Sequence, residues 1–167
     1  MLIRESASFR LGVAWIMMCV ALTIHVTDEA LTGFLSVYNP TVIALHAKLG
    51  FWPMPLLGFR EWLTGQLAVI GILALLSRFA FRNAPWIRPI FLWVVIVAGL
   101  LNAIGHIAGT ILGHTVETVR FARPAPGFYS SPLLVIVSGY SLLQLRRTQA
   151  NEPARRRASR AGHSRSF

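Results

Sequence analysis

Four long apolar segments constrain the fold of this chain more than any other feature of its sequence. They cover about residues 11–27, 63–81, 90–113 and 132–145. A helix needs about twenty residues to cross a hydrocarbon core of about 30 Å. The second and third segments reach that length, and the first and fourth reach it only by continuing into their flanks. Each segment is apolar on all sides and does not alternate, which favours helices over the strands of a barrel.

The composition agrees with a membrane location. The chain of 167 residues is 54% hydrophobic and 13% charged, whereas about a quarter of the residues of soluble domains are charged. Cys19 is the single cysteine, so an intrachain disulfide and a thiol metal site are excluded. We therefore predict an all-α integral membrane bundle of about four transmembrane helices in a lipid bilayer, formed by residues 1–145.

The stretch between the first two segments, about residues 30–59, is compatible with two topologies. It contains "TVIALHAKLGFW", which is apolar enough for a re-entrant or interfacial helix. The alternative is a fifth span, which would reverse the orientation of every later segment. Trp15, like the other four tryptophans, falls near a predicted helix end, where an amphipathic ring prefers the membrane interface.

The basic residues predict the orientation. With four spans, twelve of the sixteen Lys and Arg residues lie on one side, and the positive-inside rule places that side in the cytoplasm. We expect a multi-pass protein of the cell membrane with both termini cytoplasmic. The first segment precedes no small-x-small cleavage site, so we expect it to be retained and not removed as a signal peptide.

The C-terminal stretch, residues 146–167, differs from the rest of the chain. It holds seven arginines and one glutamate with scattered Pro, Ser and Gly, which predicts a disordered cytoplasmic tail. Its charge could attract anionic lipid headgroups or serve only as a topology anchor. No aromatic residues alternate with the arginines, so nucleic-acid binding is not predicted.

The sequence "HVTDEA" places polar groups near the end of the first apolar segment. His25, Asp28 and Glu29 have i, i+3 and i+4 spacing, so on a helix they project from one side. At about 1.5 Å per residue, His25 lies about 21 Å beyond residue 11. This position is in the outer half of the bilayer, where ionisable groups usually mark a functional site.

The third apolar segment supplies polar groups at a matching depth. Asn102 and His106 have i, i+4 spacing, and His106 lies about 24 Å beyond residue 90. Gly105, Gly109 and Gly113 repeat on the same face, and small residues at this spacing allow a neighbouring helix to approach closely. We therefore expect this polar face to pack inward, against the first helix.

Three interpretations of these five residues remain open. In the first, His25, His106 and Glu29 or Asp28 bind a divalent metal ion such as zinc, iron or manganese, with one position left open. In the second, a buried carboxylic acid exchanges protons with a lipid-like substrate without a metal. Both describe an intramembrane enzyme acting on a hydrophobic molecule. In the third, the side chains form an interhelical polar clamp in a non-enzymatic protein, such as a small transporter subunit or an assembly factor.

The segments "HVTDE", "NAIGHIAGT" and "RPAPGF" together resemble the HXXEE-domain proteins, a family of small multi-pass membrane proteins without an established activity. The resemblance covers about residues 11–145. It aligns His25 and Glu29 with the first histidine and second glutamate of that family, His106 with its later histidine, and Pro126 and Gly127 with its Pro-Gly. Two positions depart from the pattern. Asp28 occupies the position of the family's first glutamate. Pro124 occupies the position of a tyrosine, whose role Tyr129 could take.

Overall fold

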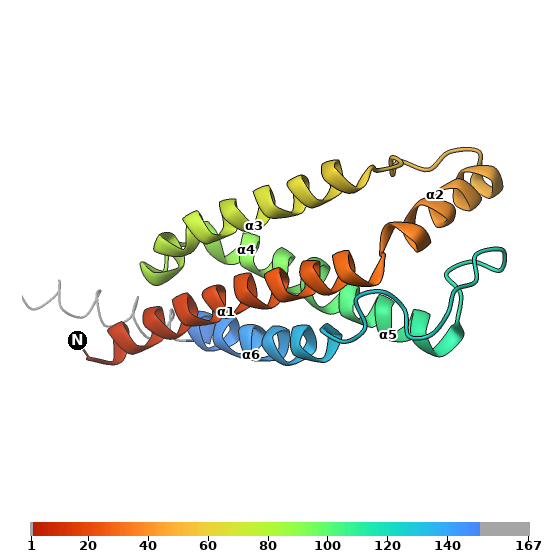
Figure 1. Ribbon diagram of the computed structural model, residues 1–167. Helices are drawn as coiled ribbons and strands as arrows, with labels where there is room; N and C mark the ends of the chain where they lie inside the picture. Colours follow the sequence, from red (N-terminus) through yellow and green to blue (C-terminus); the bar gives the residue numbers. More distant parts are fainter. Residues whose placement is uncertain (1, 151–167) are drawn as a thin grey trace, which may run out of the picture.

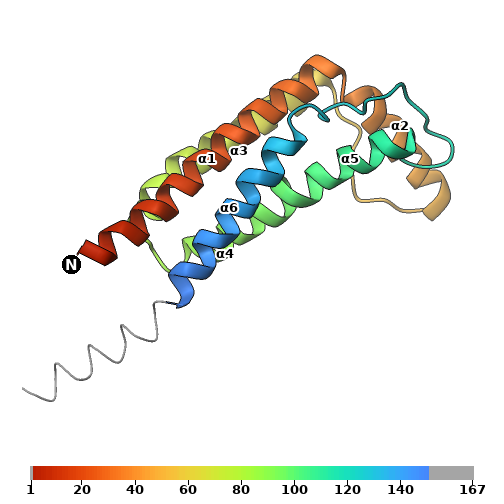
Figure 2. The same cartoon turned by 90° about the horizontal axis from the view of Figure 1, so that it is seen from below.

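The computed structural model describes residues 2–150, and these form helices joined by short turns and two longer loops (Figure 1). The predicted all-α class is confirmed. The helices are α1 (Leu2–Thr32), α2 (Leu35–Leu49), α3 (Phe59–Phe81), α4 (Ile87–Trp93), the π-helix η1 (Val94–Leu101), α5 (Asn102–Leu112) and α6 (Ser131–Ala150). The segment α4–η1–α5 is continuous, so four long helical rods lie side by side (Figures 1 and 2).

Three of the rods are long and apolar enough to cross a membrane: Ser8–Thr32, Phe59–Phe81 and Ile87–Leu112. The first rod is longer than the apolar segment predicted at residues 11–27, because helical structure continues through "HVTDEALT" to Thr32. The second and third agree closely with the predicted segments. The fourth rod, α6, is less apolar than these three and is not among the candidate spans. Length and composition therefore support three spanning helices and do not establish the predicted four.

Helix α1 is the central element of the bundle and lies between α3 and α6 (Figures 1 and 2). Its buried residues follow a helical repeat that includes Leu11, Trp15, Met18 and Leu22. The Trp15 indole donates a hydrogen bond of 2.7 Å to the carbonyl of Leu73 on α3. The prediction that this tryptophan lies at the interface is therefore wrong, since α1 begins at Leu2 and Trp15 is well inside it.

Helix α6 buries several small polar side chains beside apolar ones such as Leu134, and leaves other apolar side chains exposed. Its fully buried residues include Ser131, Ser138 and Ser141, whereas Ile136 is 69% exposed. Small polar residues let helices pack closely in membranes, and this composition explains why α6 is less apolar than the other rods. The helix continues to Ala150, beyond the predicted start of the tail at residue 146, because Leu145 and Thr148 are buried against the bundle. The rest of the predicted tail, residues 151–167, lies outside the described residues.

The helix predicted between the first two spans is present as α2. A turn at Gly33, with φ of 77°, separates it from α1. The loop after α2 is attached to it by Asn39, whose side chain donates to the carbonyl of Leu57 (2.9 Å) and accepts from its N–H (3.1 Å). With 15 residues, α2 is too short to span a hydrocarbon core.

Candidate functional site

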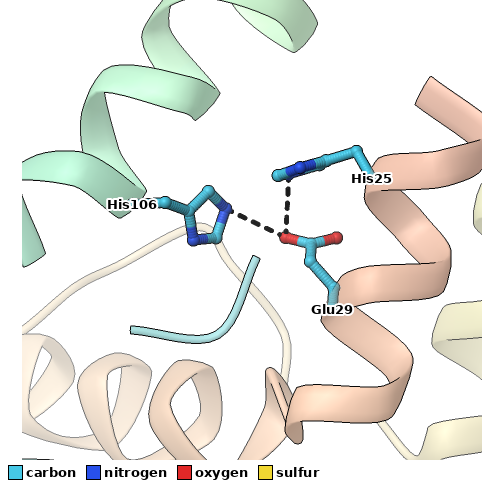
Figure 3. Close-up of side chains that lie close together, drawn as sticks. All are labelled: His25, Glu29 and His106. Atoms are coloured by element: carbon cyan, nitrogen blue, oxygen red, sulfur yellow. Dashed lines mark ion pairs between the residues drawn. The ribbon is translucent and has the colours of Figure 1, made fainter. Parts of the chain in front are cut away.

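The two histidines and the glutamate singled out in the sequence come together between α1 and α5. Figure 3 shows His25 and Glu29 pointing from α1 toward His106 on α5. The Oε1 atom of Glu29 lies 3.1 Å from Nε2 of His106 and 3.5 Å from Nε2 of His25. The exposed fractions of His25, Glu29 and His106 are 1%, 3% and 8%. We call these three residues the His/Glu cluster.

The local sequence places each side chain of the cluster. His25 and Glu29 are four residues apart, so both extend from the same face of α1. His106 comes after the π-helix η1, in which hydrogen bonds from i to i+5 widen the turn. Each extra residue in such a turn rotates the downstream residues relative to a regular α-helix. The face of α5 that meets α1 is therefore set by η1 together with the spacing of the polar residues.

Asn102 bridges the two imidazoles from one side. Its Nδ2 donates to Nε2 of His25 (2.9 Å), and its Oδ1 accepts from Nε2 of His106 (3.1 Å). Asn102 thus holds Nε2 of both imidazoles beside the Oε1 atom of Glu29.

Ser130, at the start of the fourth rod, holds the other nitrogen of His25. Nδ1 of His25 donates to the Ser130 hydroxyl (2.8 Å), which donates in turn to Oδ2 of Asp28 (2.8 Å). The same carboxylate oxygen accepts from the backbone N–H of Ser130 at 2.8 Å. This chain fixes the tautomer of His25 with its Nε2 directed at the cluster, an arrangement that is common behind histidine metal ligands.

Asp28 itself is therefore a supporting residue and not a member of the cluster. Asp28 and Glu29 are adjacent on α1 and so diverge by about 100° around its axis. Glu29 turns toward α5, while Asp28 turns toward the loop before α6. The alternative in which Asp28 replaces Glu29 as a ligand does not agree with this geometry.

The loop between α5 and α6 closes the cluster through Gly127. Its φ is 79°, a backbone conformation that favours glycine. A Cβ at this position would lie 2.9 Å from Cε1 of His106 and 3.0 Å from Cγ of Glu29. The loop is attached to α1 by the Gly127 N–H, which donates to the Thr32 hydroxyl at 3.1 Å. The backbone thus packs directly on two members of the cluster.

The cluster has the donor set of a metal site. One ligand atom from each of His25, Glu29 and His106 lies within 4.8 Å of the others. Two imidazole nitrogens and one carboxylate oxygen are the ligands of many catalytic zinc sites, which keep a fourth position for water or substrate. The same donors suit iron and manganese. The described residues around the cluster therefore fit such an ion.

Two expectations about neighbouring residues are wrong. Tyr129 is 68% exposed and cannot replace a tyrosine at the site. The glycine face of α5 does not receive a helix, since a Cβ on Gly105 would have no neighbour within 4 Å and one on Gly109 would contact only Phe121 and Ala125 of the next loop. Ser130 and Gly127 were not predicted as parts of the site, although the Pro-Gly of the resemblance pointed to Gly127.

Comparison of the chain with models of protein families, with curated proteins and with solved structures finds no match. The function is therefore argued from the site.

Proposed function

We propose that this chain is a multi-pass membrane enzyme that binds a divalent metal ion through His25, Glu29 and His106 and acts on a hydrophobic or lipid-like molecule. The observation that carries the proposal is the convergence of Nε2, Oε1 and Nε2 within 4.8 Å in a buried position between two long apolar helices. Three protein ligands leave room for a water or a substrate oxygen, which is the arrangement of a catalytic site and not of a structural one.

The membrane arrangement that goes with this function has α6 as a fourth span. Between Pro132 and Leu143 its exposed residues are apolar, and the hydroxyls of Ser138 and Ser141 are buried in the bundle, as expected for a helix at a lipid boundary. The N-terminal end of α1 and the C-terminal end of α6 lie at the same end of the bundle (Figure 1). By the positive-inside rule that end is cytoplasmic, where the basic stretch after α6 can meet anionic lipid headgroups.

The resemblance to HXXEE-domain proteins supports the same site. The positions that carry it, His25, Glu29, His106 and Gly127, lie in one cluster although they come from α1, α5 and a loop. We propose membership of that family on this basis.

Metal content of the detergent-purified protein tests the proposal. We expect about one zinc, iron or manganese ion per chain, since one set of three ligands holds one ion. Glu29→Gln and His106→Ala should each lose the metal, because each removes a ligand atom. His46→Ala is the matched control, since His46 is exposed on α2 and should keep full metal content.

A wild-type protein without metal after growth in medium supplemented with all three ions would overturn the metal proposal. Equal metal content in the wild type and in Glu29→Gln would also overturn it, because the ion would then be bound elsewhere.

A metal-free function is the second candidate, and the hydrogen bonds of Asn102 favour it. The two imidazoles are already bridged by one carboxamide, so the described network is closed without an ion. Such a network could transfer protons or could clamp α1 to α5 in a non-enzymatic protein. In a clamp, Asn102→Ala should lower the melting temperature as much as His106→Ala, whereas a metal site should lose its ion only in His106→Ala.

A further inference from the structure

A pocket of about 260 Å³ adjoins the His/Glu cluster between α2 and α5. It is bordered by Asn102 and His106 at its inner end and by residues of α2, α5 and the loop before α6. The lining residues are Phe34, Val37, Tyr38, Leu101, Gly105 and Phe121, among others. The pocket is mostly apolar and open on one side.

Two glycines of α5 provide the space. Gly105 and Gly109 both line the pocket, and a Cβ on Gly105 would meet no atom within 4 Å. A larger side chain at Gly105 would therefore project into the empty volume. Gly105 and Gly109, against which no helix packs, thus form part of the pocket wall.

Exposed apolar residues of the third candidate span lie at the pocket or beside it. Leu101 and Gly105 belong to the third candidate span, Ile87–Leu112, and Leu101 is 58% exposed. Ile104, on the same stretch of α5, is 53% exposed. In a membrane these side chains contact acyl chains, so a molecule can enter the pocket directly from the bilayer.

The polar groups of the pocket restrict what can bind. The hydroxyls of Thr41 and Thr115 are hydrogen bonded to each other, and Tyr38 donates to the carbonyl of Pro55 at 3.0 Å. Burial raises the pKa of Tyr38, so this donor stays protonated. Among the lining residues there is no Lys, Arg, Asp or Glu. Asn102 and His106 are therefore the polar side chains through which the pocket reaches the His/Glu cluster.

We infer that this pocket binds a lipid with an uncharged, oxygen-bearing end, such as a long-chain alcohol, aldehyde or ester. The oxygen lies against His106 and Asn102, and the first carbons of the chain lie over Gly105. Binding pockets usually have about 300–1,000 Å³, so this smaller volume holds only the polar end while the rest of the chain remains in the bilayer. The inference rests on the proposed function, because it assigns the substrate class of the same site.

Photolabelling in phosphatidylcholine vesicles tests the inference. The probe is a hexadecanol analogue with a diazirine near the hydroxyl and a terminal alkyne. We expect labelled peptides from α2 and α5, and competition by unlabelled hexadecanol but not by hexadecanoate. Gly105→Leu should reduce the labelling roughly tenfold, because the leucine side chain would occupy the space of the ligand.

Gly139→Leu is the matched control. Gly139 lies on α6 and also has no atom within 4 Å of a built Cβ, but it is not part of the pocket. This variant should be labelled as strongly as the wild type. Equal labelling of Gly105→Leu and Gly139→Leu, or equal competition by the alcohol and the carboxylate, would overturn the inference.

Metal content separates this inference from the proposed function. Gly105→Leu removes no ligand atom, so it should retain the metal of the wild type while losing the label. A metal-free wild type that is still labelled at the pocket would refute the metal proposal and leave the pocket assignment standing. A metal-loaded wild type without label at α2 or α5 would refute the pocket assignment alone.

Discussion

At the scale of single residues, Gly127 determines how closely the loop before α6 approaches the site. It combines a positive φ of 79° with direct packing on His106 and Glu29. Gly50 has a similar φ of 68° but no atom within 4 Å of a built Cβ. The two positions therefore separate the cost of the backbone conformation from the cost of crowding the cluster.

We predict that Gly127→Ala destabilises the protein by about 2–5 kcal/mol, the sum of a left-handed alanine and an overpacked contact. Gly50→Ala should destabilise the protein by only about 1–2 kcal/mol, since the left-handed backbone conformation is its single cost. Thermal unfolding in detergent measures both. Gly127→Ala should also lower metal content, whereas Gly50→Ala should not. Equal effects of the two variants would show that the loop does not shape the cluster.

The sequence predicts residues of this site unevenly. His25, Glu29, Asn102 and His106 could be grouped because each pair has helical spacing, and the depth of a residue along a helix can be obtained by counting. Ser130 could not be found in this way, since it comes after a long loop whose path has no periodicity. A residue that such a loop brings to the site is recognised only in the folded chain.

At the scale of helices, the contact between η1 and α6 holds the fourth rod against the third. A Cβ on Gly99 would overlap Oγ of Ser138 and lie 3.4 Å from Cε of Met18. The Ser138 hydroxyl is buried and has no hydrogen-bond partner among the described residues. The close approach of the two helices thus depends on the small size of both residues.

Gly99→Ala should therefore destabilise the bundle by about 1–3 kcal/mol through overpacking. Adding Ser138→Gly should restore part of this loss, because it removes the overlapping hydroxyl and its Cβ. A double-mutant cycle of melting temperatures measures the coupling between the two positions. Additive effects would contradict a direct contact between Gly99 and Ser138.

The helices themselves were predicted to different extents. The segments at 63–81 and 90–113 have no polar stretch that interrupts them, so they correspond closely to α3 and to Ile87–Leu112. The first helix extends well beyond its apolar segment because Glu29 and Thr32 are tied to partners in other elements. The π-helix η1 was not predicted, since its apolar sequence carries no signal that distinguishes it from an α-helix.

At the scale of the whole molecule, the arrangement of the rods gives the bundle two distinct ends. One end contains the beginning of α1, the turn between α3 and α4 and the end of α6, and the other contains α2 (Figures 1 and 2). In a membrane, the proposed four spans place these ends on opposite sides.

Cysteine labelling tests this arrangement, because Cys19 is buried and should give little background. Ala47 on α2 and Pro85 in the turn before α4 are both exposed. In intact cells, Ala47→Cys should react with a membrane-impermeant maleimide, whereas Pro85→Cys should react only after permeabilisation. Labelling of both variants in intact cells would contradict the proposed topology.

The origin of the cluster in two distant helices has a consequence for biosynthesis. Asn102 lies 77 positions after His25, so α1 leaves the ribosome well before the helix that completes the ligand set. His25 and Glu29 are therefore synthesised before His106. An ion that needs all three side chains can bind only after the third rod, which contains α5, has packed against α1. Metal acquisition would therefore be a late step of maturation, and an occupied site would mark a chain whose assembly in the membrane is complete.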